Sequence, residues 1–416
     1  MVFHVLNHLW SQPVPIGKWA PSTIKATETP PACPQSACNV NDILCPKVYI
    51  PNFHMKLGIL GFLATGTGPD DLKGNYGILD QQLAIHWVKS NIDAFGGDPN
   101  KITLFGQSTG AQSTTIHYLR HEMQPFFRAA IIQSCPVAIP FRTYVQYITP
   151  TILLVQQLNY TLDGISCFRA SSYHDIVAAQ NVINSKITSL QFLQFFEPWL
   201  PVIDNIIVGG QLMDMFSSTS FLLKPLIIGT MNEEALGYVY GELTQPLSPL
   251  GYLTVGPILF GSNFSAIAMR YPPEGSGDQR PLLARLVTQW VFACPTRVLA
   301  HKAAAYSYVF GYPLRTTGII NAGICEARAC HGYELPFLFQ AFWLNFTNAD
   351  RYISQTLATY WTNYAKSKNP NHPVKVPLAW SKLASQSEKY LNFTDPVQIT
   401  TNYLMNDCNF WDGIGY

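Results

Sequence analysis

A serine stands between two glycines in the sequence GQSTG at Gly106–Gly110, which has the pattern G-x-S-x-G. The apolar run Ile102–Phe105 precedes it, and Ala111–Arg120 can begin a helix. On a tight strand-to-helix turn a serine hydroxyl projects from the sheet, and the helix N-terminus favours the negative charge that develops during attack. Such a turn needs small residues on both sides of the serine. The pattern therefore favours Ser108 as a nucleophile over a structural serine in a glycine-rich loop.

A serine nucleophile needs a base and an acid that orients the base, and after such a turn they follow in the order Ser, Asp/Glu, His. His301, His331 and His372 are the downstream candidates for the base. His301 lies in a helical pattern and His372 in the polar stretch KNPNHP, so a structural role accounts for both. His331 follows the strand-like YSYVF and stands beside Gly332, where a parallel sheet presents its catalytic loops. His331 is the predicted base.

Composition predicts a large folded protein with an extensive core. The chain has 416 residues, of which 48% are hydrophobic and 12% charged. A formal charge of +1 provides no overall field that would attract nucleic acid or an anionic membrane. We find no uninterrupted apolar run of about 18 residues and therefore expect no transmembrane segment.

Short apolar runs alternate with helical patterns along the chain. This order predicts an α/β fold with a mostly parallel central sheet and helices on both faces. We expect one domain over residues 1–416, with lid or cap excursions roughly within 140–330. Helical periodicity marks Tyr76–Phe95, Arg285–Ala305 and Arg351–Ser367. The strand-like runs are Val48–Ile50, Leu57–Leu63, Ile102–Phe105, Ala129–Gln133, Leu226–Ile228 and Tyr306–Phe310.

Four phrases together resemble the type-B carboxylesterases, the α/β-hydrolases that include cholinesterases and related lipases. These phrases are GNYGILDQQLAIHWV, DPNKITLFGQSTGA, KPLIIGTMNEEALGY and CHGYELPFLF, in that order. The resemblance runs from about Trp10 to Trp411. It implies hydrolysis of a small-molecule carboxylic ester through an acyl-enzyme, with no cofactor and no metal.

The resemblance also assigns roles. It places the family's elbow serine on Ser108, its loop histidine on His331 and its acid on Glu234. GTMNEEA matches the family's G-x-x-x-[DE]-E-G with alanine in place of the last glycine. Glu233 is the alternative acid if that register is shifted by one residue. In this mechanism His331 takes the serine's proton, and Glu234 fixes the imidazole tautomer and stabilises its charged form.

The nine cysteines can be sorted with the same resemblance. It implies a disulfide between Cys294 and Cys408, which joins a late helix to the C-terminus. Cys325 and Cys330 flank a short loop that ends at His331 and are candidates for a second bond. Cys33 matches the first half of another family bridge.

Other cysteines stay without an assigned partner. Either Cys38 or Cys45 could replace the missing partner of Cys33, because the family's cysteine position carries Ile43. The partner expected for Cys167 is absent, and Cys135 is predicted to be a buried thiol. An odd total leaves at least one cysteine unpaired.

Several features indicate a secreted protein or one in the endomembrane lumen. The cysteines fit an oxidising compartment, and four N-x-[ST] sequons are candidate glycosylation sites. The start MVFHVLNHLWSQPVP lacks the pattern of a signal peptide, so we expect the N-terminus to be incomplete. The sequons are at Asn159, Asn263, Asn345 and Asn392.

The chain also departs from the family. KVYIPNF runs straight into HMKLGILGFL, where the family has a segment of about forty residues with a central strand and the HGGG-type oxyanion loop. An N-terminal hairpin is also missing. The N–H of Thr109 is the one oxyanion donor that can be assigned.

Two function classes therefore compete. The first is a serine esterase with the triad Ser108, Glu234 and His331. The second is a catalytically impaired relative that uses the hydrolase surface to bind or adhere to proteins, as its missing oxyanion loop suggests. The sequence does not indicate an oligomeric state.

Overall fold

The structure, a computed structural model, describes Trp10, Gln12 and residues 57–160, 165–184, 186, 197–315, 322–341, 344–384 and 387–416. Its chain divides into two compact units. Unit 1 contains Met1–Pro99 and Pro140–Gln211, and unit 2 contains Asn100–Ile139 and Leu212–Tyr416. The expectation of a single domain stays a prediction.

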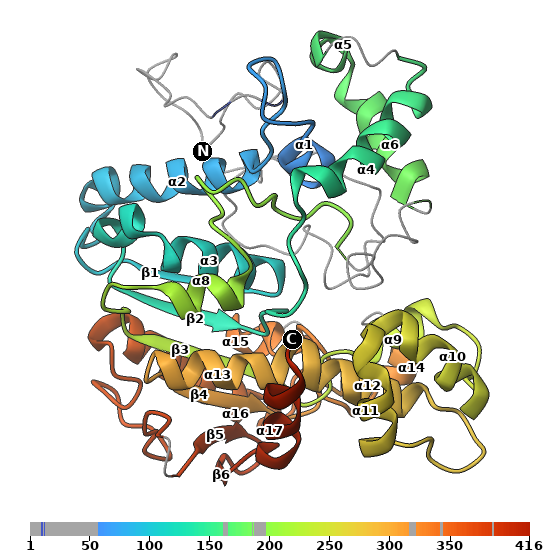
Figure 1. Cartoon of the computed structure of the whole chain (residues 1–416). Helices are drawn as coiled ribbons and strands as arrows, with labels where there is room; N and C mark the ends of the chain where they lie inside the picture. The colour runs from blue at the N-terminus through green and yellow to red at the C-terminus, as the bar shows by residue number, and fades with distance from the viewer. Residues whose placement is uncertain are drawn as a thin grey trace. The chain divides into compact units, whose positions relative to one another are not determined.

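Unit 2 contains a six-stranded sheet in the order β1-β2-β3-β4-β5-β6 (Figure 1). The first five strands are parallel, and β6 is antiparallel to β5. Residues in β2, β3 and β4 are buried throughout, as expected for strands covered on both faces. The α/β class predicted from the sequence is confirmed. The strands are β1 (Thr103–Gln107), β2 (Ala129–Gln133), β3 (Leu226–Met231), β4 (Tyr306–Phe310), β5 (Lys389–Phe393) and β6 (Gln398–Thr401).

Aromatic contacts identify the helices on one face of this sheet. Tyr306, Tyr308 and Phe310 alternate along β4 and therefore point to the same side. Their rings lie 6.1, 5.2 and 5.7 Å from those of Tyr364, Trp361 and Phe337, respectively. These partners belong to α15 (Leu335–Leu338) and α16 (Asn348–Ser367).

A second group of helices covers the other side of the strands. It consists of α3 (Thr109–Leu119), which contacts β1 and β2, α13 (Cys294–Lys302), which contacts β3 and β4, and α8 (Leu212–Ser218), which contacts both helices. The rest of unit 2 is helical. Its other elements are η2 (His121–Phe126), α9 (Leu236–Glu242), α10 (Pro249–Phe260), η4 (Gly261–Asn263), α11 (Phe264–Arg270), α12 (Arg280–Val287), the π-helix η5 (Thr288–Ala293), α14 (Ala322–Cys325) and α17 (Met405–Ile414).

Unit 1 is helical where the structure describes it. The side chain of Asn75 joins two of its segments, because its amide donates to Val202 O at 2.8 Å and accepts from Val202 N at 2.9 Å. A capping box at Thr143 and Gln146 begins α4. The elements are α1 (Gly58–Phe62), α2 (Tyr76–Asn91), η1 (Ile92–Phe95), α4 (Tyr144–Gln157), α5 (Ile165–Ala170) and α6 (Tyr173–Asn184).

One strand prediction is wrong. Leu57–Leu63 was expected to be a strand, but Gly58–Phe62 form α1, with Gly61 N bonded to Leu57 O at 3.2 Å. A short apolar run has no periodicity that separates a strand from a buried helical turn. The expected strand Val48–Ile50 lies outside the described residues.

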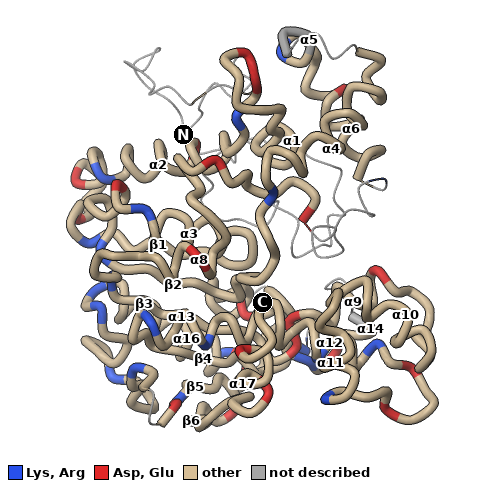
Figure 2. Tube along the Cα trace, viewed as in Figure 1, with Lys and Arg blue, Asp and Glu red and all other residues tan. Residues whose placement is uncertain are grey.

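The stretch Pro249–Arg270 is long and apolar enough to cross a membrane, with a mean hydropathy of 1.2 and 33% of its window buried. It consists of two α-helices separated by η4 rather than one continuous helix. Core helices of folded proteins also meet this length and composition test. Figure 2 shows basic and acidic residues interspersed along the described chain, which agrees with the net charge near zero.

Candidate active site

Ser108 lies between β1 and α3 with its backbone at φ 58° and ψ −124°. A non-glycine residue with positive φ is strained, and such strain is typical of a nucleophile on a strand-to-helix turn. Ser108 N bonds to Gln133 O at 3.0 Å and so continues the pairing of β1 with β2. Thr109 is the first residue of α3, and the first N–H groups of a helix have no acceptor within it. Its N–H is therefore available to an anion.

The two glycines beside the serine differ in what they permit. A Cβ on Gly106 would lie 2.2 Å from Gly110 O and 2.7 Å from Thr114 Oγ1, which no side chain allows. A Cβ on Gly110 would meet nothing within 4 Å. The tight turn therefore requires a glycine before the serine, whereas at Gly110 the side-chain direction is open. The expectation that both sides must be small holds sterically for Gly106 alone.

Glu234 and His331 are brought together from loops after β3 and β4. His331 Nδ1 lies 2.5 Å from Glu234 Oε2, and both side chains are buried. Because a carboxylate accepts, Nδ1 carries the proton and donates it to this bond. The neutral imidazole then has its lone pair on Nε2, which is the tautomer that a general base requires.

Neighbouring groups fix both partners. Glu234 Oε1 accepts a hydrogen bond from Met231 N at 2.8 Å. The next residue, Ala235, donates its N–H to Thr288 Oγ1 at 3.0 Å, and Thr288 begins the π-helix η5. The His331 ring lies 5.3 Å from the ring of Phe292, also in η5. The π-helix thus supports both the acid and the histidine, and π-helical segments are frequent at functional sites.

Gln107, the residue before the serine, contacts the other nitrogen of His331. Its side-chain amide nitrogen lies 3.1 Å from His331 Nε2. An amide NH₂ only donates, so His331 Nε2 is the acceptor, in agreement with the tautomer set by Glu234. The lone pair that a serine proton would need is therefore engaged by the Gln107 amide in this structure.

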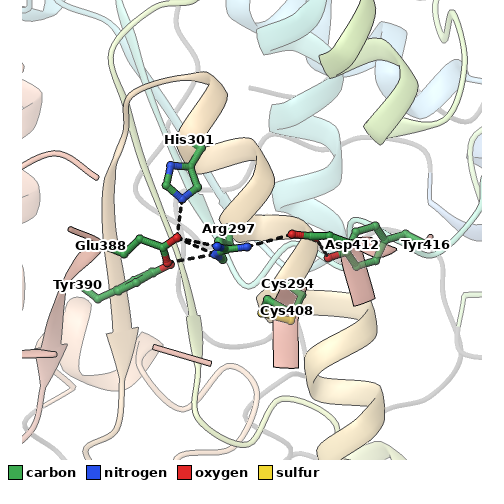
Figure 3. A network of polar contacts seen from close by, with 8 residues as sticks. All are labelled: Cys294, Arg297, His301, Glu388, Tyr390, Cys408, Asp412 and Tyr416. Carbon is green, nitrogen blue, oxygen red and sulfur yellow. Dashed lines mark hydrogen bonds and ion pairs between the residues drawn. A yellow bond between two sulfur atoms is a disulfide. The ribbon is translucent and has the colours of Figure 1, made fainter. Parts of the chain in front are cut away.

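The alternatives left open by the sequence occupy other positions. Glu233 forms an ion pair with Arg328 at 2.5 Å and its Oε2 accepts from Ala329 N at 3.3 Å. His301 Nε2 lies 2.9 Å from Glu388 Oε1, as Figure 3 shows. His372 is exposed in its loop. The structure brings Glu234, and not Glu233, to His331.

Two disulfides are present in the described residues. Cys294 is bonded to Cys408, and Cys325 to Cys330, which closes the loop immediately before His331. The thiol of Cys135 is buried outside any disulfide, with its Sγ 3.8 Å from Thr115 Oγ1. Cys33, Cys38, Cys45 and the side chain of Cys167 lie outside the described residues, as does the junction between Phe53 and His54.

The four sequons differ in accessibility. Asn159, Asn263 and Asn345 are exposed. Asn392 lies in β5 between two other strands, its Nδ2 donates to Thr400 Oγ1 at 3.2 Å and its Oδ1 is buried. The structure therefore disfavours a glycan at Asn392, because its amide nitrogen is hydrogen-bonded and its amide oxygen is buried.

Sequence reasoning missed a buried acid behind the site. Glu334 is fully buried three residues after His331, and its Oε1 accepts from the Gln133 amide at 3.0 Å. Burial, and after it the charge of Glu234, raises the pKa of Glu334 to about 7. The available signal was a single acid within the apolar phrase GYELPFLF.

A cavity of about 310 Å³ opens beside the acid loop. Ser108 and His331 do not line it, and Glu233 and Arg328 in its wall already neutralise each other. The other residues of its wall are Asn232, Leu236, Pro281, Ala284, Arg285, Thr288, Gln289, Tyr403 and Leu404.

Comparisons with known proteins find relatives that match most of this chain. The crystal protein of Dictyostelium discoideum is 30% identical over 383 residues, which cover 89% of this chain and 68% of that protein. The cAMP-regulated D2 protein of the same organism is 29% identical over 376 residues, covering 88% and 69%. Neuroligin-2 of Rattus norvegicus is 27% identical over 417 residues, covering 88% of this chain and 47% of that protein.

The chain thus spans about two thirds of the two Dictyostelium proteins and less than half of neuroligin-2. A model of the carboxylesterase family matches residues 42–249 and 263–411, well over half of the chain. The chain belongs to the carboxylesterase family.

Proposed function

We propose that this protein is a serine hydrolase that cleaves carboxylic esters. Ser108 attacks the ester carbonyl, His331 removes the serine proton and returns it to the leaving alcohol, and water hydrolyses the acyl-enzyme. Glu234 holds the imidazole and stabilises its charged form. The observation that carries the proposal is the 2.5 Å contact between His331 Nδ1 and Glu234 Oε2. The same histidine contacts Gln107, the residue before the strained Ser108.

The oxyanion that forms during attack needs donors. The N–H of Thr109 at the start of α3 is the donor that the proposal assigns. In related hydrolases a second loop supplies further N–H groups, and each oxyanion donor contributes roughly 10²–10³ in turnover. We therefore expect slow turnover if Thr109 acts alone.

A protein-binding function is the second candidate. It is favoured by the contact of Gln107 with His331 Nε2, which occupies the lone pair needed for catalysis. In this case the hydrolase surface would bind a partner protein while Ser108 stays unactivated.

We further propose that the protein resides outside the cell or in the endomembrane lumen. The two disulfides support an oxidising compartment. Asn159, Asn263 and Asn345 are the proposed glycan acceptors because their side chains are exposed.

Covalent labelling separates the two candidates. A fluorophosphonate probe reacts only with an activated serine, so the wild type should be labelled at Ser108 and should hydrolyse a short-chain aryl ester. Ser108→Ala should abolish labelling and lower kcat by on the order of 10⁶-fold, which leaves no detectable hydrolysis. Ser113→Ala, one turn further along α3, is the matched control and should retain both activities.

The opposite results are equally informative. A Ser108→Ala protein with unchanged hydrolysis would disprove the nucleophile. A correctly folded wild type that shows neither labelling nor hydrolysis would reject the esterase and favour the protein-binding function.

A further inference from the structure

Glu334 belongs to a buried chain of hydrogen bonds behind His331. Gln133 Oε1 accepts from the indole N–H of Trp361 at 2.9 Å. Because an indole can only donate, this bond turns the Gln133 amide so that its NH₂ faces Glu334 Oε1, 3.0 Å away. Strand β2 and helix α16 thus hold one oxygen of Glu334 in place.

The other oxygen of Glu334 has no hydrogen-bond partner among the described residues, and neither does the hydroxyl of Tyr308. The titratable groups facing Glu334 are Glu234 from the loop after β3, His331 from its own loop and Tyr308 from β4. No lysine or arginine in the described part of the chain forms an ion pair with Glu234 or Glu334. Two buried carboxyls therefore lie near one imidazole, which is the group between them that can become positive.

A second buried negative charge without a cation is costly, so one of the two carboxyls must hold a proton. Glu234 accepts hydrogen bonds at both oxygens and is therefore the charged one. Glu334 therefore carries the proton, on the oxygen that accepts no hydrogen bond from the described residues. A protonated Glu334 leaves Glu234 as the anion that contacts His331.

We propose that Glu334 is a positioning residue for His331, which acts as a protonated carboxyl and keeps the imidazole basicity suited to general-base catalysis. The inference rests on the proposed function of Ser108 and His331. When Glu334 loses its proton, the added negative charge stabilises the imidazolium form of His331. Less of the histidine is then neutral at a given pH, and less of it can accept the serine proton.

Coupled titration gives this role a signature. The charge on Glu334 affects the protonation of His331. The wild-type imidazole should therefore lose its proton over a broad pH range in two overlapping steps. In Glu334→Gln the side chain is neutral at every pH and still accepts from Gln133. The imidazole of that variant should titrate in one step, at a pH lower by on the order of one unit.

The titration can be measured without catalysis. We would label histidine Cε1 with ¹³C in Ser108→Ala and follow the His331 resonance by NMR, assigned by its absence in His331→Gln. Ser108→Ala/Glu334→Gln should show the lower midpoint. Adding Glu233→Gln instead is the matched control, because Glu233 is half-exposed and paired with Arg328, and it should leave the midpoint unchanged.

Activity provides the second readout. The rising limb of the fluorophosphonate labelling rate against pH should move with the imidazole midpoint in Glu334→Gln. Glu334→Leu removes the acceptor of the Gln133 amide and should lose labelling at every pH, so Glu334→Gln should rescue it.

Two failures can be told apart. An unchanged His331 midpoint in Ser108→Ala/Glu334→Gln, or a shift of equal size with Glu233→Gln, would overturn the role of Glu334. Absence of labelling in the wild type would overturn the proposed function, whereas the NMR titration would still measure the coupling.

Discussion

Glu388 and Glu334 are both buried glutamates of unit 2 that lie near a histidine, one beside the C-terminal helix and the other behind Ser108. Figure 3 shows the first environment, a C-terminal clamp made by Arg297, His301, Glu388, Tyr390, Asp412 and Tyr416 beside the Cys294–Cys408 disulfide. Arg297 Nε donates to the Glu388 oxygens at 2.9 and 3.0 Å. A second nitrogen of Arg297 reaches Asp412 Oδ2 at 2.9 Å.

The pKa values of the two glutamates are shifted in opposite directions. Burial opposes ionisation of Glu388, but hydrogen bonds from Arg297 and His301 outweigh it and lower the pKa of Glu388. At Glu334 burial and Glu234 act together, and the pKa rises to about 7. The difference is the arginine. A histidine beside a buried carboxylate is therefore insufficient evidence of catalysis, and the missing cation distinguishes the candidate active site from the structural clamp.

The largest expected effect comes from removing the cation of the clamp. Arg297→Met leaves Glu388, whose side chain is 4% exposed, without its principal partner. Breaking a buried ion pair from one side costs about 3–5 kcal/mol. We expect a loss of that size in the free energy of unfolding, measured by urea denaturation with the disulfides intact.

The double variant Arg297→Met/Glu388→Leu is the control for this prediction. It removes both charges and should recover most of the loss, because no buried carboxylate is left without a cation. A single variant that loses less than about 1 kcal/mol would show that the clamp behaves as an exposed pair.

The second prediction tests how stability depends on pH at Glu334, whose pKa is raised instead of lowered. A rise of its pKa from 4.5 to about 7 on folding corresponds to about 3 kcal/mol. For a raised carboxyl, this stability is fully present below pH 4.5 and is lost as the pH rises through 7. Wild-type stability should therefore fall by about 3 kcal/mol relative to Glu334→Gln between pH 4 and pH 8.

Glu388→Gln gives the reverse trend and serves as the comparison. A lowered pKa contributes stability above the ordinary value, and that stability is lost as the pH falls through the folded-state pKa. The advantage of the wild type over Glu388→Gln should therefore shrink in acid. Parallel pH curves for Glu334→Gln and the wild type would contradict the protonated state of Glu334.

The sequence predicted the sheet best where strands are short, apolar and fully buried. Ala129–Gln133 and Tyr306–Phe310 have the expected bounds because their burial on both faces gives an uninterrupted apolar run. Lys389–Phe393 and Gln398–Thr401 were not foreseen, since both mix polar with apolar residues and Gln398–Thr401 is an edge strand of the sheet. Edge strands need less apolar surface, which weakens the pattern.

The candidate site was predictable where a residue belongs to a local motif. Ser108 stands in a turn whose glycine requirement is local, and His331 was singled out by its place after the strand-like YSYVF. Glu234 was found through the resemblance. Gln107 and Glu334 were missed because their importance depends on neighbours more than 95 residues away in sequence, His331 and Glu234. No spacing rule within one segment carries that information.

The smallest expected effect concerns Arg142 in unit 1, a buried cation without an anionic partner among the described residues. Arg142 is 0% exposed, and its three guanidinium nitrogens have no hydrogen-bond partner in the part of the chain that the structure describes. Its guanidinium lies 5.9 Å from the centre of the Tyr147 ring, and burial lowers the pKa of Arg142. Arg142 thus resembles Arg297 after loss of its carboxylates.

A buried donor without a partner costs about 1–3 kcal/mol, and more when charged, so an apolar side chain of similar length should be better tolerated. We expect Arg142→Met to raise the free energy of unfolding by about 1–2 kcal/mol, in contrast to the loss for Arg297→Met. Arg142→Lys keeps the buried charge and should bring no gain, which makes it the control in the same urea titration. If Arg142→Met instead destabilises the protein, the guanidinium has an anionic partner, and adding inorganic phosphate or acetate to the wild type would then show whether a bound anion supplies it. Such a result would place Arg142 with Arg297 as a compensated cation and leave the Glu234–Glu334 pair as the single uncompensated cluster in the comparison.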